Sequence, residues 1–171
     1  MTSETIAVLE KDGLTVTAFK VDHDPIKPAV GYRFDYKGRS VVISGDTAKS
    51  ASLERAAKGA DILVHEALAS HMVKKMTAAA GKRGMTNTAT ITTDILNYHA
   101  SPTEAAESAQ TAGVQQLVLS HLVPPIPSSY FYPAFLADAP DKFDGPIVVG
   151  EDGMLFSLPA NKTGIEQTQL K

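Results

Sequence analysis

The stretch Asp61-Ile62-Leu63-Val64-His65-Glu66 is a short apolar run that ends in a histidine and a carboxylate. Two further apolar runs lead to polar residues in the same way: Val41-Val42-Ile43 precedes Asp46, and Leu117-Val118-Leu119 precedes His121. Runs of this length are typical of buried strands, and ligands of open α/β sheets bind at the carboxyl ends of such strands. The sequence therefore predicts one shared site. Taken singly, Asp46 could cap the following helix, and His65 and His121 could each be core residues.

Strand and helix patterns alternate around these runs. Hairpins are predicted for residues 6–19 and 29–44, and helices for 52–57, 68–80, 90–98, 101–112 and 132–137. Strands at 146–149 and 154–158 complete the pattern. The helix over 101–112 has the clearest boundaries, because Ser101-Pro102-Thr103-Glu104 is a helix start and Gly113 a stop. We expect one α/β domain over residues 1–171, with 160–171 as a flexible tail.

The composition excludes several classes of protein. The chain has no cysteine, so disulfides and thiolate metal sites are absent, and any metal must be held by histidines and carboxylates. No apolar run is long enough to cross a bilayer, and the first residues do not resemble a secretory signal, so we expect no membrane role and a cytoplasmic protein. A signal in a missing amino-terminal half is the alternative. The net charge of −3, without blocks of like charge, makes nucleic acid an unlikely partner.

The other histidines carry weaker signals. His99 stands just before the helix start at Ser101, where the partial positive charge of the helix terminus favours a neutral imidazole. Such a ring can bind a metal or accept a proton, although an ordinary loop histidine fits the pattern equally well. We interpret His23 and His71 as solvated residues, and the sequence contains no H-E-x-x-H motif.

Four motifs together carry a resemblance to a known family. They are Ser44-Gly45-Asp46-Thr47, the segment Ala60 to Ala67, the segment Tyr98 to Ala106, and the segment Leu117 to Pro124. In order and spacing they resemble the carboxyl-terminal half of a metallo-β-lactamase-fold hydrolase, closest to its ribonuclease Z-like and arylsulfatase-like branch. The resemblance implies half of an αββα sandwich, with a mixed sheet and helices on one face.

The resemblance also implies roles for individual residues. The family binds two zinc ions, which polarise the scissile bond and supply a hydroxide nucleophile. Asp46 matches the carboxylate that bridges the two metals, and His121 matches the last imidazole ligand of the second metal. Glu66 and His99 match the carboxylate–imidazole pair that delivers a proton to the leaving group in the ribonuclease Z branch.

One part of the family pattern is missing from these 171 residues. No H-x-H-x-D-H motif, the source of most family ligands, occurs in the sequence, and only His23 is a distant candidate for the histidine ligand that precedes Asp46. We leave that ligand unassigned, because the loop around His23 differs from the corresponding loop of the family. Two ligands are too few for zinc, so we expect half of a hydrolase, inactive alone, with weak or absent zinc binding.

Two functions are compatible with this pattern. The first is a metal-dependent hydrolase of an ester, phosphodiester or lactone-type substrate. The second is a non-catalytic assembly or regulatory module that has lost the dinuclear zinc site. Within the first, a small-molecule substrate is favoured over tRNA, because the net charge is acidic and no basic, glycine-rich arm precedes Asp46.

A half sandwich also predicts association. We expect its inner sheet face to be apolar and to be represented by Val16, Phe34, Val42 and Val148. Such a patch marks an interface. The expected partner is a second copy, in a homo-oligomer and most simply a dimer, or a separate amino-terminal half.

Overall fold

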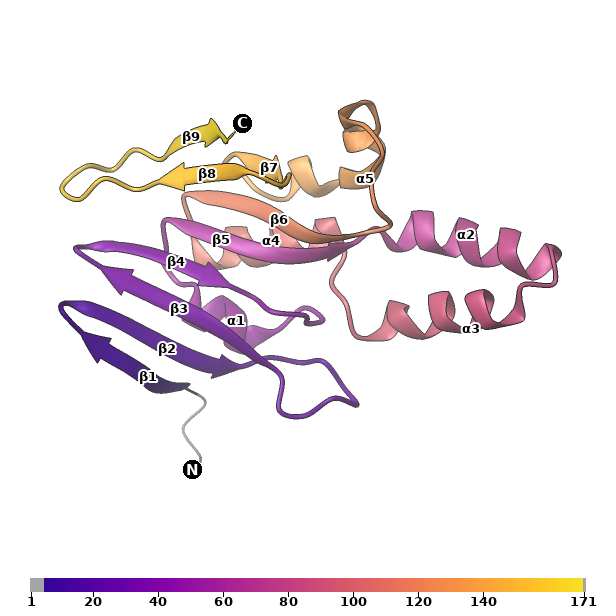
Figure 1. The fold of residues 1–171 in the computed structure, drawn as a ribbon, viewed down its shortest axis with the longest axis horizontal. Helices are drawn as coiled ribbons and strands as arrows, with labels where there is room; N and C mark the ends of the chain where they lie inside the picture. The colour runs from indigo at the N-terminus through magenta and orange to yellow at the C-terminus, as the bar shows by residue number, and fades with distance from the viewer. Residues whose placement is uncertain (1–4, 171) are drawn as a thin grey trace.

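The computed structural model describes residues 5–170 and is built around one seven-stranded sheet (Figure 1). Its strands lie in chain order, antiparallel from the first to the fourth and parallel from the fourth to the seventh. Both predicted hairpins are present, and the mixed sheet is the one expected. The strands are β1 (Thr5–Lys11), β2 (Leu14–Lys20), β3 (Val30–Tyr36), β4 (Arg39–Ile43), β5 (Ile62–Leu68), β6 (Gln116–Val123) and β7 (Ile147–Val149).

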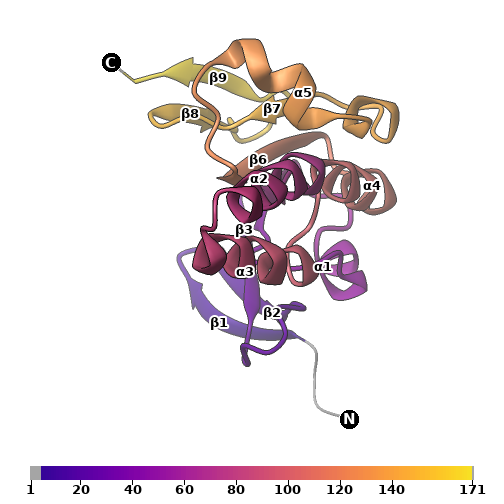
Figure 2. The same ribbon diagram turned by 90° about the vertical axis from the view of Figure 1, so that its right-hand side faces the viewer.

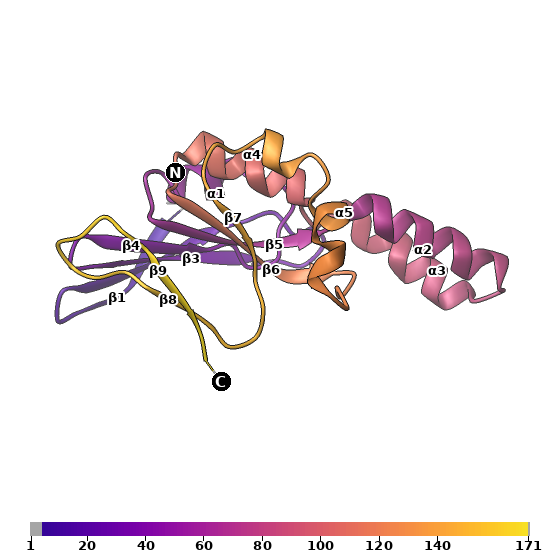
Figure 3. The same cartoon turned by 90° about the horizontal axis from the view of Figure 1, so that it is seen from above.

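Two helices, α1 (Ala51–Ala56) and α4 (Pro102–Ala112), cover one face of the sheet (Figure 3). Alanines of α4 lie in the main core cluster with Leu63 and Leu117, since small side chains let the helix approach the strands closely. The predicted boundaries of α4 are confirmed. Ser101 and Glu104 form a reciprocal capping box, and Gly113 ends the helix in a left-handed conformation with φ of 65°.

The helices α2 (Ser70–Lys82) and α3 (Thr86–Asp94) form an antiparallel hairpin that extends beyond the sheet (Figures 1 and 2). The 3-10 turn η1 (Ile95–Asn97) follows α3. The sequence predicts the second helix only from Thr90, but α3 begins at Thr86. Its threonine hydroxyls bond to carbonyls one turn earlier in the helix, as when the Thr92 hydroxyl donates to the Thr88 carbonyl at 2.8 Å. Among residues 5–170, no helix has the length and apolar character needed to span a membrane.

The carboxyl-terminal segment forms a separate two-stranded ribbon next to β7 (Figure 1). The segment 160–171, for which we expect a flexible tail, contains one of its strands. The preceding loop is bound by Arg39, whose guanidinium donates to the carbonyls of Pro159, Lys162 and Gly164 and pairs with Asp61 at 3.0 Å. The elements here are η2 (Ser129–Phe131), α5 (Tyr132–Leu136), η3 (Ala139–Asp141), β8 (Met154–Ser157) and β9 (Glu166–Gln169).

The prediction for the inner sheet face was wrong at Val42. Phe34 pairs with Val16 on one side and with Val41 on the other, so these three side chains share the face away from the helices. Val42 is the next residue along β4, and it therefore points to the helix side, where it is fully buried in the core.

The face opposite the helices is apolar and partly open. By register, Tyr32 and Ile43 lie on it together with Ile6, and all three are at least 40% exposed. Exposed apolar side chains on neighbouring strands form a patch of the kind found at interfaces.

Candidate metal centre

Four predicted site residues reach the same end of the sheet from different elements. Asp46 follows β4, Glu66 lies near the end of β5, His99 precedes α4, and His121 lies in β6. The pairing of β5 with β6 shifts register at His121, because Glu66 faces Ser120 while Ala67 faces Leu122. His121 is thus an extra residue in a bulge, with φ of 45°, a conformation that non-glycine residues adopt only when their surroundings impose it.

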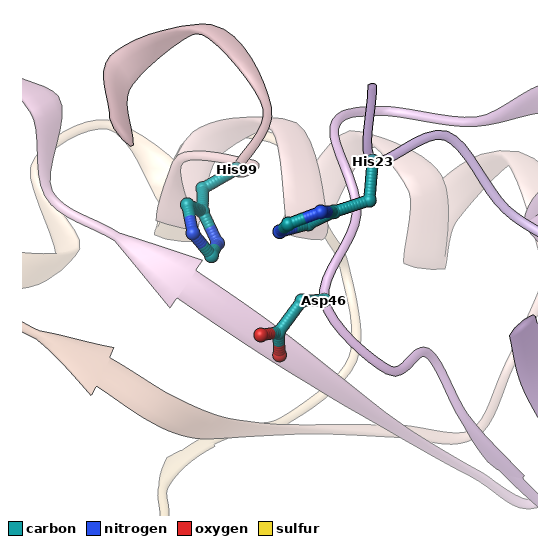
Figure 4. Close-up of side chains that lie close together, drawn as sticks. All are labelled: His23, Asp46 and His99. Atoms are coloured by element: carbon teal, nitrogen blue, oxygen red, sulfur yellow. The ribbon is translucent and has the colours of Figure 1, made fainter. Parts of the chain in front are cut away.

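The side chains of His23, Asp46 and His99 converge (Figure 4). One ligand atom from each residue lies within 4.8 Å of the others. His121 adjoins this group, with its Nε2 3.7 Å from Asp46 Oδ2 and its ring centroid 5.8 Å from that of His99. Three imidazoles and one carboxylate therefore lie close enough together to contribute to a common cation site.

Glu66 is buried and binds His99 directly. Its Oε1 accepts hydrogen bonds from His99 Nδ1 at 2.9 Å, from the Ala100 N–H at 3.1 Å and from the Thr47 N–H at 3.2 Å. Its Oε2 is buried and has no hydrogen-bond partner among the described residues. Three donors on one oxygen fix the position of the carboxylate.

The helix terminus was expected to favour neutral His99, but the pKa of His99 is raised instead. The hydrogen bond that His99 donates to Glu66 raises the pKa of His99, with a smaller contribution from the charge of Glu66, while burial opposes this effect. A carboxylate 2.9 Å from the ring outweighs the partial charge of a helix terminus, because the helix contribution is small and diffuse. Glu66 also fixes the ring, so that Nε2 is the nitrogen left for other contacts.

His23 is the member of the group that sequence reasoning missed. It is half-buried in the loop after β2, with its ring 4.8 Å from the Tyr98 ring and 5.2 Å from the His99 ring, measured between centroids. The loop is joined to the Asp46 segment by a hydrogen bond from the Asp22 N–H to Thr47 Oγ1, at 3.0 Å. The available signal was the family's histidine ligand before Asp46, a position for which His23 is the only histidine in the sequence.

The other two histidines lie outside the group. His65 is fully buried, donates from Nδ1 to the Glu66 carbonyl at 2.7 Å, and has a pKa lowered by burial. It adjoins Glu66 in sequence, but successive strand residues point to opposite faces, so only Glu66 reaches the site. His71 bonds through Nε2 to the Ala134 carbonyl at 2.7 Å.

Residues 1–122 match the family described as the beta-lactamase superfamily domain. The chain belongs to this superfamily. A putative ribonuclease Z of Mycobacterium tuberculosis is 37% identical over 143 residues, covering 84% of this chain and 58% of the relative. A ribonuclease Z of Mycobacterium sp. strain KMS is 39% identical over 117 residues, covering 68% of this chain and 37% of the relative. This superfamily chain thus spans about half the length of the first of these relatives, and less of the second.

Solved structures show the same fold. The metallo-beta-lactamase fold protein YhfI from Bacillus subtilis superposes with a TM-score of 0.61 at 17% identity, covering 94% of this chain and 52% of that one. The short form of human tRNase Z gives a TM-score of 0.58 at 22% identity, covering 91% and 46%. The predicted metallo-β-lactamase fold is confirmed. The ribonuclease names of the relatives are at odds with our expectation of a small-molecule substrate and of nucleic acid as an unlikely partner.

Proposed function

We propose that these residues form part of a metal-dependent phosphodiesterase that acts on RNA, similar to ribonuclease Z. The observation that carries the proposal is the convergence of His23, Asp46, His99 and His121 at one edge of the sheet, with Glu66 beneath His99. The names of the curated relatives support an RNA substrate over the small-molecule ester expected from charge alone.

The donor set fits zinc. Imidazole nitrogens and a carboxylate oxygen are ligands that zinc accepts, and catalytic zinc sites commonly use three protein ligands. Asp46 and His121 would hold the metal as the family resemblance implies, and His23 would be the further histidine ligand. When bound, zinc supplies Lewis-acid polarisation of a phosphoryl oxygen.

Glu66 and His99 would act beside the metal ligands. Glu66 accepts the Nδ1 hydrogen of His99 and so fixes its tautomer and its ring. His99 would then deliver a proton from Nε2 to the leaving oxygen, which is the role its family position implies. A cavity of about 900 Å³, lined by His121, Tyr132 and Phe156 among others, opens beside the metal ligands and offers room for part of a nucleotide chain.

Zinc titration of the full chain, with hydrolysis of bis(p-nitrophenyl) phosphate measured in parallel, tests this proposal. We expect weak zinc binding, which Asp46→Ala and His121→Ala each reduce by at least about 10-fold, and a low zinc-dependent hydrolysis that falls with it. His71→Ala is the matched control, because His71 lies outside the group and bonds to Ala134. Unchanged zinc affinity in both site variants would contradict the metal site and favour a non-catalytic module.

Two substrates with different leaving groups distinguish two possible roles of His99. A metal ligand at this position predicts that His99→Gln lowers zinc affinity. A proton donor predicts unchanged zinc affinity, with a larger loss of rate on an RNA substrate than on the p-nitrophenyl ester, because p-nitrophenolate leaves without protonation.

The open sheet face supports association with a second copy. Tyr32, Ile43 and Ile6 leave apolar surface exposed on a single chain, and a symmetric dimer or a separately supplied amino-terminal half would cover it. Sedimentation at micromolar concentration tests this, and a well-behaved monomer without any partner would contradict it.

A further inference from the structure

Positive charge is concentrated in the helical hairpin. The segment from Ala69 to Tyr98, here called the α2–α3 arm, contains four basic residues and one acidic residue, whereas the whole chain has 16 basic and 19 acidic residues. The four cations are Lys74, Lys75, Lys82 and Arg83. All four are exposed, and none of their side chains forms a hydrogen bond or an ion pair with any described residue. An acidic protein therefore carries one uncompensated basic projection.

Two of these cations, Lys75 and Lys82, lie on the side of α2 that faces away from α3. Val73 and Ala80, seven residues apart, are buried on the α3 side of the helix, and Thr77 between them bonds to Thr92 at 2.7 Å. At about 100° per residue, Lys75 and Lys82 fall on one line roughly 200° around the helix from Val73 and Ala80. Lys74 lies about 100° from that line, on the flank of the helix, and Arg83 follows at the tip, so Lys75 and Lys82 form a basic stripe on the outer surface of α2.

The arm is joined to the candidate metal centre at both of its ends. Its first helix follows β5, the strand that carries Glu66, and its last residue, Tyr98, precedes His99. The Tyr98 ring lies 4.8 Å from the His23 ring and 5.1 Å from the His99 ring, between centroids. From this base the 13 residues of α2 extend about 20 Å, away from the sheet (Figures 1 and 3).

We propose that the outer face of the α2–α3 arm binds the phosphate backbone of RNA at a distance of several nucleotides from the bond that is cleaved. The inference rests on the proposed function for its choice of polyanion. Free cations spaced two helical turns apart on a helix match a regular row of phosphates, and binding releases counterions from the RNA. The expectation that the chain lacks a basic arm considered only the region before Asp46, whereas this arm follows Glu66.

Fluorescence anisotropy of a labelled RNA stem-loop with the full chain tests the inference. The quadruple variant Lys74→Ala, Lys75→Ala, Lys82→Ala and Arg83→Ala should bind RNA at least about 10-fold more weakly near 50 mM salt, and the slope of log affinity against log salt should become shallower by roughly 3. Binding of an RNA dinucleotide should not change, because it is too short to reach from the site to the arm.

The matched control removes four exposed lysines from the other end of the sheet, Lys11, Lys37, Lys58 and Lys162. It loses the same net charge, so an equal loss of RNA binding in both variants overturns the proposal and leaves only non-specific attraction. The proposal is also overturned if the wild type does not bind the stem-loop, or if vesicles of phosphatidylserine and phosphatidylcholine bind the arm as tightly as RNA does.

The same proteins separate this inference from the proposed function. Hydrolysis of bis(p-nitrophenyl) phosphate reports on the metal site, and the arm variant should retain the wild-type rate because the small ester does not reach the arm. If no zinc-dependent hydrolysis occurs but RNA binding still depends on the arm, the proposed function fails and the arm proposal stands.

Discussion

Helix α4 and the α2–α3 arm are neighbours in the chain but differ in how they are stabilised. Six residues of α4 are buried, and its alanines pack on the strands that carry the site. The nine residues of α3 include no buried side chain, and α2 has only Val73 and Ala80. The body of the protein gains stability by removing apolar surface from water, whereas the arm depends mainly on the pairing of its two helices.

The two regions also differ in how clearly the sequence marks them. The capping box of Ser101 and Glu104 and the terminal Gly113 define both ends of α4. The helices of the arm have no side-chain cap at their amino ends, at Ala69 and Met85. The body therefore provides a fixed support for the site, and the arm can open locally without loss of the body.

The largest expected difference between body and arm is in the cost of removing an apolar side chain. Leu63→Ala removes a fully buried side chain of the main core, and it should lower the free energy of unfolding by about 2–5 kcal/mol. Met76→Ala in the arm, where the side chain is 47% exposed, should change it by no more than about 0.5 kcal/mol. Urea denaturation of both variants measures the difference, and equal costs would contradict the division into body and arm.

The next largest effect is a pH dependence of stability, which arises from His65 in the body of the protein. Burial lowers the pKa of His65, so the unfolded chain takes up a proton near pH 6.5 that the folded chain does not bind. The contribution of His65 to stability should therefore be constant above about pH 6.5 and fall below it by up to about 1.4 kcal/mol per pH unit. His65→Asn keeps a donor for the Glu66 carbonyl but cannot titrate, so its loss of stability on acidification should be smaller.

The comparison with His65→Asn is needed because His99 acts in the opposite sense. Its raised pKa contributes stability that is present at low pH and is lost as the pH rises through the folded value. Both proteins contain His99, so the difference between their denaturation profiles isolates His65. Parallel profiles between pH values of about 5 and 8 would contradict the assignment of acid sensitivity to this buried ring.

Sequence reasoning succeeded where short sequence patterns determine the structure. The apolar runs before Asp46, Glu66 and His121 became neighbouring parallel strands, so these residues reached one edge together with His99. The same holds for α4, because a cap and a stop act within one turn of the helix.

Sequence reasoning failed where long-range contacts decide the structure. His23 enters the group because Asp22 bonds to Thr47, 25 residues away, and no local pattern encodes that contact. Val42 was assigned to the wrong face because a shift of one residue along a strand moves a side chain to the opposite face of the sheet. The ribbon of β8 and β9 follows a loop bound by Arg39, more than 100 residues away in the chain.

A smaller effect is expected at the boundary of α4. Ser101 Oγ accepts from the Glu104 N–H at 3.2 Å, and Glu104 Oε2 accepts from the Ser101 N–H at 2.8 Å. Ser101→Ala should cost about 1 kcal/mol of global stability, because the helix it caps is part of the body. A thermal denaturation midpoint equal to that of the wild type would show that α4 is held by packing alone.

The smallest effect on global stability, and the one that bears most directly on the independence of the arm, is expected from Thr92→Val. The Thr92 hydroxyl links α3 to α2 through Thr77, and valine keeps the shape and a similar helix propensity without the hydrogen bond. The loss should be about 0.5–1.5 kcal/mol, but it should act on the local opening of the arm. Hydrogen exchange should therefore quicken for amides of α2 and α3 while those of β5, β6 and α4 keep their rates, and the urea midpoint should not move. A shifted midpoint with uniformly faster exchange would mean instead that arm and body unfold as one unit, and that the basic stripe is held as rigidly as the site from which it extends.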